Sequence, residues 1–184
     1  MNNNLFAPLP DKKFQIIYAD PPWDYKGQNQ HNGKGGVTTG GADTHYPTVK
    51  LNDLKTLPVA DIADENSLLF MWSSSPHLDQ AIELGKAWGF EWATVGFVWD
   101  KKKLNPGFYT MSQVELCLIF KKGKIPQPRG ARNIRQLIRE KRTEHSVKPY
   151  EAHLRINMMF PEQDKIELFA RNKVPGWHLW GNDV

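Results

Sequence analysis

The chain has 184 residues with a formal net charge of +4, and 40% of them are hydrophobic and 11% aromatic. This composition excludes a disordered chain, and the single cysteine, Cys117, excludes a disulfide framework and a cysteine-rich metal site. No apolar run is long enough to span a membrane, and the first residues do not form a signal-peptide pattern. We therefore expect residues 1–184 to form one domain that stays in the cytoplasm and has no membrane partner.

Predicted strands and helices alternate along the chain. Apolar runs rich in β-branched and aromatic residues predict five strands, at residues 14–19, 67–72, 94–99, 114–120 and 166–170. Helices are predicted at residues 51–57, from Ser75 and Pro76 to Gly89, and after Pro149. Several strands are apolar throughout, which is typical of strands covered on both faces. The expected fold class is α/β, with a mostly parallel sheet, helices on both faces and ligands beyond the carboxyl ends of the strands.

Two segments stand out by their composition. Residues 26–45 contain six glycines and almost nothing apolar, which predicts a flexible loop without regular structure, slightly favoured as a lid. Residues 121–148 hold ten basic residues against two acidic ones, a local charge of +8. Such a segment indicates either a polyanionic partner or an ordinary solvated surface.

The sharpest local pattern is ADPPW at residues 19–23, directly after the first predicted strand. Its two prolines make the turn stiff, so the turn holds its carbonyl groups in fixed directions. Methyl transfer to an aromatic amino group needs acceptors for the N–H groups, because the nitrogen lone pair is otherwise delocalised into the ring. Asp20 and the Pro21 carbonyl would supply these acceptors, while Trp23 or Tyr25 stacks on an extruded base. A rigid turn with a solvated acid is the alternative.

The sequence ADPPW resembles the catalytic motif of the MT-A70 family of adenine-N6 methyltransferases. Further segments resemble this family in its own order: HYPT at 45–48, LFMW at 69–72, FVWDK at 97–101, ELCL at 115–118, HSVKP at 145–149, KIELFAR at 165–171 and W-x-x-x-GN at 177–182. One short motif arises easily by chance, but an ordered set does not. The resemblance implies a single catalytic domain with a Rossmann-like, S-adenosylmethionine-dependent methyltransferase fold and a permuted motif order.

The resemblance also implies roles for individual residues. The catalytic turn would consist of Asp20, Pro21, Pro22 and Trp23. The residues expected to bind S-adenosylmethionine are Asp20, Lys148, Glu167, Arg171, Asn172 and Asn182. Those expected to bind the substrate, from the motifs and the basic segment, are Trp23, Tyr25, Tyr46, Lys101, Arg132, Arg135 and His145. Lys148 suits the methionyl carboxylate because an ammonium group acts as a point charge. Trp72, Trp99 and Cys117 are expected in the core, and no metal is implied.

We expect the chain to transfer a methyl group to the N6 amino group of adenine in nucleic acid, with DNA favoured over RNA. That preference rests on the compact chain and on its likeness to prokaryotic and phage-type members, so a prokaryotic or phage-infected host cell is the expected setting. Two alternatives stay open: an RNA adenine-N6 methyltransferase, and a non-catalytic nucleic-acid-binding subunit. A homodimer or a heteromeric partner is also compatible with the abundant tryptophans.

Overall fold

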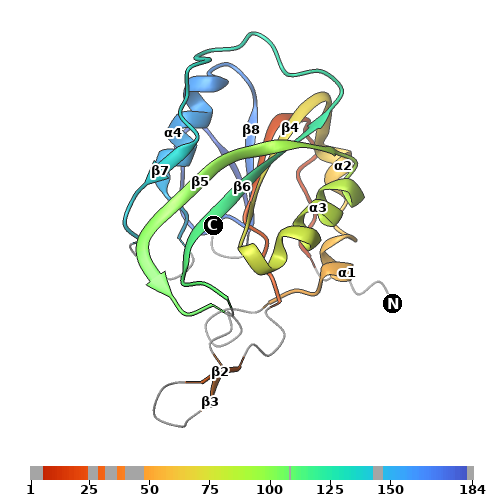
Figure 1. Cartoon of the computed structure of the whole chain (residues 1–184). Helices are drawn as coiled ribbons and strands as arrows, with labels where there is room; N and C mark the ends of the chain where they lie inside the picture. The colour runs from red at the N-terminus through yellow and green to blue at the C-terminus, as the bar shows by residue number, and fades with distance from the viewer. Residues whose placement is uncertain are drawn as a thin grey trace, which may run out of the picture.

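The computed structural model describes residues 6–24, 29–31, 37–39, 48–107, 109–142 and 147–181. Its centre is a seven-stranded sheet (Figure 1). In spatial order the strands are β7 (Leu137–Arg139), β5 (Glu91–Asn105), β6 (Ser112–Lys122), β4 (Ala63–Ser73), β1 (Phe14–Ala19), β8 (Lys165–Leu168) and β9 (His178–Trp180). All five strands expected from the sequence are present, and the α/β class is confirmed.

Most strand pairs of the sheet are parallel, as expected. β1 pairs in parallel with β4 and β8, β8 with β9, and β5 with β7. β6 runs antiparallel to both of its neighbours, because it returns directly from β5 and then lies beside β4. The sequence did not predict β7 and β9, since each has only three residues and gives no recognisable run.

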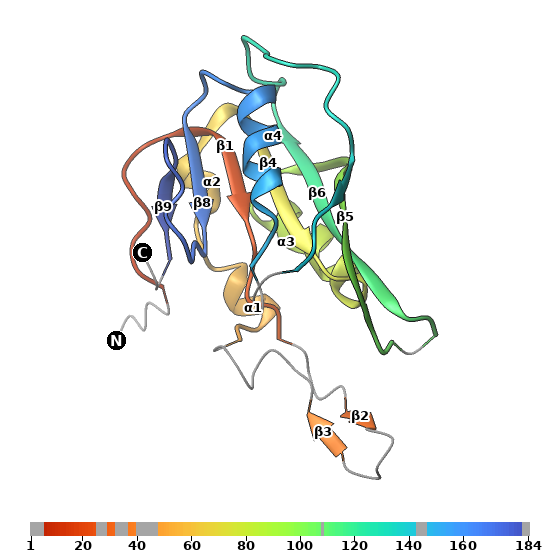
Figure 2. The ribbon, with the colours of Figure 1, turned by 90° about the vertical axis from the view of Figure 1, so that its left-hand side faces the viewer.

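Helices cover both faces of the sheet, which confirms the expected layers (Figure 2). Successive side chains of a strand point to opposite faces, so β1 contributes to two cores. Ile17 and Ala19 pack with α1 (Leu51–Leu54), α2 (Val59–Ile62) and α3 (Leu78–Ala87). Ile16 and Tyr18 pack on the other face with α4 (Tyr150–Met159).

The helices begin and end where local chemistry requires it. The helical turn η2 (Ser75–His77) has Pro76 in its first positions and leads into α3, which therefore starts two residues later than a single α-helix from Pro76 would. Gly89 follows α3 with a φ of 89°, a conformation that favours glycine. The predicted helix at residues 51–57 is regular only as α1, and none of the described helices is long and apolar enough to cross a bilayer.

The Gly-rich segment contains regular structure in its described part. β2 (Asn29–His31) pairs with β3 (Val37–Thr39) in an antiparallel two-stranded sheet. The expectation of a loop without regular structure is therefore wrong for these six residues, because their backbone groups pair with each other. The rest of residues 26–45 lies outside the described residues.

The ends of the strands form two opposite sides of the main sheet, which we call the carboxyl edge and the opposite edge. The carboxyl edge, which we define by Asp20, Ser74 and Arg171, follows the last residues of β1, β4 and β8. The opposite edge is defined by Phe14, Ser67 and Lys122, and Ser67 pairs there with Lys122. Because β6 is antiparallel, it carries the chain from the carboxyl edge to the opposite edge.

This course divides the basic segment 121–148 into two parts. Lys121, Lys122 and Lys124 lie at the opposite edge, where the backbone N–H of Lys124 donates to the Asn66 side chain. Residues 123–131 then run along the top of the molecule in Figures 1 and 2, away from the lower end of β1. The expectation of one basic surface that flanks the turn after β1 is therefore corrected. The chain runs back toward the carboxyl edge through Arg135, which lies beside Arg155 of α4, and β7.

Candidate active site

The turn after β1 is fixed from both sides. The Pro21 carbonyl accepts the Trp23 N–H at 2.9 Å, and the Pro22 carbonyl accepts the Val49 N–H at 2.9 Å. Trp23 and Val49 also form a parallel β-bridge. Together with the restricted φ of both prolines, these bonds hold the Asp20 carboxylate and the neighbouring carbonyl groups in a defined arrangement.

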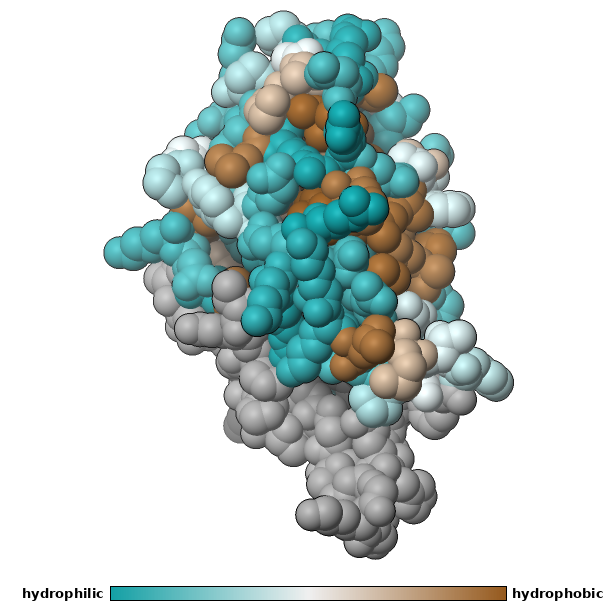
Figure 3. All heavy atoms as spheres, turned by 60° about the vertical axis from the view of Figure 1, so that its left-hand side comes forward, coloured by the Kyte–Doolittle hydropathy of each residue, from teal (hydrophilic) through white to brown (hydrophobic). Residues whose placement is uncertain are grey.

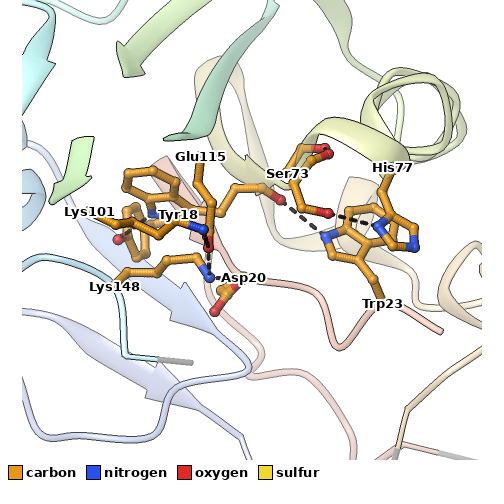
Figure 4. Close-up of polar contacts among 10 residues, drawn as sticks. Tyr18, Asp20, Trp23, Ser73, His77, Lys101, Glu115 and Lys148 are labelled. Carbon is orange, nitrogen blue, oxygen red and sulfur yellow. Dashed lines mark hydrogen bonds and ion pairs between the residues drawn. The ribbon is translucent and has the colours of Figure 1, made fainter. Parts of the chain in front are cut away.

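Four charged side chains meet beside this turn (Figure 4). The Lys148 ammonium lies 3.1 Å from Asp20 Oδ1 and 3.0 Å from Glu115 Oε2, and Lys101 Nζ lies 3.3 Å from Glu115 Oε1. The Lys148 ammonium is also 5.9 Å from the centre of the Trp72 ring. All four charged side chains are at least four-fifths buried, so solvent screens their interactions weakly.

Strand topology explains how these residues come together. Asp20 follows β1, and Lys148 lies just before α4 on the same face of the sheet. The antiparallel register of β6 pairs Leu116 with Ser73, so Glu115 lies one residue beyond the end of β4. Four segments that are distant in the sequence therefore deliver alternating positive and negative charges to the carboxyl edge.

The pKa values follow from burial and from these neighbours. Burial raises the pKa of Asp20 above its ordinary value, although Lys148 and Arg171 oppose the rise. Burial acts on Glu115 in the same direction, but Lys148 and Lys101 outweigh it and lower the Glu115 pKa. The two carboxylates likewise outweigh burial at Lys148 and raise its pKa, so it stays an ammonium ion at neutral pH.

Trp23 is part of the core and supports the turn from inside. It is 5% exposed, its indole N–H donates to the Trp72 carbonyl at 3.3 Å, and its ring stacks on His77 at 5.7 Å between centroids. His77 Nε2 donates to the Asp24 carbonyl at 3.4 Å, and Nδ1 lies 2.8 Å from the Ser74 hydroxyl. In this conformation a base cannot stack on Trp23 without displacing His77. The expected stacking role of Trp23 is replaced by a supporting one.

Glu167 lies on the α4 face of the sheet instead of at the carboxyl edge. Its Oε2 atom is 2.8 Å from His153 Nε2, and the His153 ring lies 4.6 Å from that of Tyr18. Tyr18 in turn accepts the Trp72 indole N–H at 2.6 Å. This buried network gives the Oε2 atom of Glu167 a partner within the protein, and the expected cofactor contact of Glu167 stays a prediction.

The structure brings some of the other expected residues together and separates others. Lys101 is 5% exposed and paired with Glu115, so its expected place on an exposed phosphate-tracking surface is wrong. Arg171 follows β8 at the carboxyl edge and acts on the charge of Asp20, whereas Asn172 is exposed. Arg132 follows Ala131, whose N–H donates to Met158 at the far end of α4. Arg132 therefore lies away from the turn.

Four expected site residues, Tyr25, Tyr46, His145 and Asn182, lie outside the described residues. Trp72, Trp99 and Cys117 are buried, as expected for core positions. Sequence reasoning missed two functional candidates, Glu115 and His77. The available signal was position: Glu115 lies within the ELCL segment, and His77 follows the end of a predicted strand, where α/β sheets present their ligands.

Known proteins resemble this chain along most of its length. The MT-A70 family model matches residues 14–183. Type II methyltransferase M.MunI from Mycoplasma sp. is 50% identical over 192 residues, which cover 99% of this chain and 82% of the relative. Two human proteins are each 25% identical over 94% of this chain: N(6)-adenine-specific methyltransferase METTL4, of which 38% is covered, and N(6)-adenosine-methyltransferase catalytic subunit METTL3, of which 28% is covered.

These matches run through all the segments that build the carboxyl edge, from the turn after β1 to the charges of β6, α4 and β8. The chain therefore belongs to the MT-A70 family, whose methyltransferases use S-adenosylmethionine.

Proposed function

We propose that this chain transfers the methyl group of S-adenosylmethionine to the N6 amino group of adenine in DNA. The observation that carries the proposal is the buried Asp20 carboxylate at the end of β1, which is held by Lys148 beside the carbonyl of Pro21. A carboxylate and a carbonyl at adjacent positions of a stiff turn are a matched pair of acceptors for the two hydrogens of an amino group.

The charges at the carboxyl edge fit the cofactor. S-adenosylmethionine carries a carboxylate, an ammonium and a sulfonium group, and when bound it supplies an electrophilic methyl group. Asp20 and Glu115 suit its cationic groups, while Lys148 and Arg171 suit its carboxylate and polar groups. Lys148 already contacts the carboxylates of Asp20 and Glu115. The cofactor carboxylate would either replace Asp20 as a partner of Lys148 or join these two.

Asp20 has to be ionised to act as a charged acceptor and to take up a proton. Burial raises its pKa, and the ammonium of Lys148 at 3.1 Å counteracts this by stabilising the anion. By accepting an N–H group, the carboxylate returns electron density to the adenine nitrogen and lets it become pyramidal. The Pro21 carbonyl already accepts the Trp23 N–H, but a carbonyl oxygen has a second lone pair for the other hydrogen.

The same carboxylate gives the departing proton a path. When the amino nitrogen gains a methyl group it becomes positively charged, and one N–H proton has to leave to restore the neutral amine. Asp20 already accepts that N–H in this arrangement, and 14% of its side chain remains exposed to pass the proton to water. No covalent enzyme intermediate is needed, which agrees with the buried position of Cys117.

DNA is proposed as the polymer on the basis of the relatives. M.MunI, which is a type II methyltransferase, aligns with 99% of this chain and 82% of its own length. METTL4, which is N(6)-adenine-specific, supports adenine N6 as the acceptor. The relatives named for adenosine are longer, and this chain covers only 23–28% of each of them.

Methyl transfer from labelled S-adenosylmethionine to duplex DNA, single-stranded DNA and RNA tests the proposal, with the nucleosides identified by mass spectrometry. The expected product is N6-methyladenine in DNA, and it should disappear with Asp20→Asn. A preference for RNA would overturn the choice of polymer. The absence of both cofactor binding and product on any polymer would instead support the non-catalytic alternative.

A further inference from the structure

A second polar site lies between β7 and α4. A pocket of about 380 Å³ opens there, and its charged lining comprises Arg135, Arg139, Glu140, Glu151 and Arg155. β7 and α4 lie side by side on the left of Figure 1, and Figure 3 brings that side forward. The described surface in that view is largely hydrophilic, with separate apolar patches.

The pocket adjoins the carboxyl edge through the first turn of α4. Lys148, which holds Asp20, is three residues before Glu151 of the pocket wall. On the other wall, Arg139 of β7 lies opposite Asp100 in the register of β7 with β5. Asp100 is one residue before Lys101 of the charge cluster. Both walls of the pocket are therefore continuous with segments that contribute to the charge cluster.

The charges of the pocket wall are not equally available. Arg155 donates from Nε to Glu151 and from one terminal nitrogen to the carbonyls of Arg135 and Leu137, so it is held in the wall. It also neutralises Glu151. Arg135 and Arg139 are exposed, and with Glu140 they leave the pocket one positive charge in excess. One excess positive charge matches the single negative charge of a phosphodiester.

An exposed aromatic side chain lies in the sequence between Lys148 of the charge cluster and Glu151 of the pocket wall. Tyr150 is 49% exposed and follows Lys148 and Pro149 at the start of α4. The ring of the buried His153 stacks on one side of it, at 5.8 Å between centroids and an interplanar angle of 29°. An exposed ring that is held in place from behind is a platform on which a nucleic-acid base can stack at little entropic cost.

We propose that Tyr150 and the pocket between β7 and α4 bind the nucleotide next to the target adenine. Arg135 and Arg139 hold its backbone phosphate, and Tyr150 stacks on its base. This inference rests on the proposed function, because it takes the substrate to be a polynucleotide. It assigns the polymer contact to a built pocket instead of to the net charge of the basic segment.

The test is binding of the full chain to a mixed-sequence duplex DNA, measured by fluorescence anisotropy over a range of salt concentrations. Arg135→Gln combined with Arg139→Gln should lower the slope of log Kd against log salt by about 0.9, because the contact with one phosphate is lost. Lys86→Gln combined with Lys124→Gln removes the same charge from exposed positions elsewhere and should leave the slope unchanged. Equal changes in both double variants, or no change in either, would overturn the inference.

Tyr150 is tested separately from charge. Tyr150→Leu should weaken binding about tenfold through lost stacking, while Tyr150→Phe should bind like the wild type. Equal binding by all three proteins would remove Tyr150 from the site. Failure of the inference is distinguishable from failure of the proposed function. If the wild type forms N6-methyladenine in DNA and the arginine variants keep the wild-type salt slope, only this inference is wrong.

Discussion

Two ion pairs at opposite edges of the sheet use the same residue types in different surroundings. At the carboxyl edge, Lys148 lies 3.1 Å from Asp20, and both side chains are 14% exposed. At the opposite edge, Lys12 lies 2.9 Å from Asp164, with side chains that are 40% and 56% exposed. The N–O distances are nearly equal, so the two pairs differ mainly in their burial. Water screens the outer pair, whereas the inner pair cannot lose one member without leaving an uncompensated charge.

The largest expected difference between the edges is in catalysis. Asp20→Asn keeps the shape of the side chain but removes the anionic acceptor, and methyl transfer should fall at least about a hundredfold. Asp164→Asn makes the same chemical change at the opposite edge and should leave transfer unchanged. Steady-state rates with circular dichroism as the folding control measure both. Equal rates for the two variants would refute the role of Asp20.

The next difference is in stability. Lys148→Met leaves Asp20 and Glu115 without their shared ammonium, and the free energy of unfolding should fall by about 3 kcal/mol. Lys12→Met breaks the exposed pair and should cost less than about 1 kcal/mol. Urea denaturation measures both changes. Similar losses at the two edges would show that burial does not separate the pairs.

A smaller effect is a shift of the pH profile. The negative charge of Glu115 raises the pKa of Asp20, so Glu115→Gln should lower that pKa and move the acidic limb of the transfer rate to lower pH. The positive charge of Lys148 lowers the same pKa, so Lys148→Met should move the limb to higher pH. Glu162→Gln changes an exposed residue at the opposite edge and should leave the acidic limb of the pH profile unchanged. Shifts in the same direction for the two cluster variants would contradict the electrostatic account.

The smallest expected effect concerns the support of the turn. Trp23→Phe keeps the stacking on His77 but loses the N–H bond to the Trp72 carbonyl, which should cost about 1 kcal/mol of unfolding free energy. Trp92→Phe, at a 48% exposed position of the opposite edge, should change the free energy by less than about 0.5 kcal/mol. Thermal denaturation compares them. A larger loss for Trp92→Phe would contradict the buried role of Trp23.

The sequence predicted the parts of the fold that have a strong local signal. The first strand was predicted at its observed bounds, because five of its six residues are apolar and Asp20 with two prolines follows it. β7 was missed because its three residues include two that are exposed. The six described residues of β2 and β3 were missed because glycines and polar residues around them indicate a loop, while pairing depends on the backbone.

The candidate site was predicted in its residues more than in its geometry. Asp20 and Lys148 were named from the sequence, but their pairing depends on two segments that only the tertiary fold brings together. Lys101 looked exposed because it opens a run of three lysines, yet the alternation of strand side chains turns it inward to Glu115. Local sequence cannot show which side of a strand will face the core at such a run.

The pH dependence of single-turnover methyl transfer, in the wild type and in Asp20→Asn, tests the central claim most directly. The wild-type rate should fall as pH falls through the raised pKa of Asp20, because a protonated carboxyl group is a weaker acceptor for the N–H group and cannot take up the departing proton. The residual rate of Asp20→Asn, measured with labelled methyl groups, should show no such limb. The same limb in both proteins would mean that another group titrates and that the Asp20 carboxylate is not the acceptor.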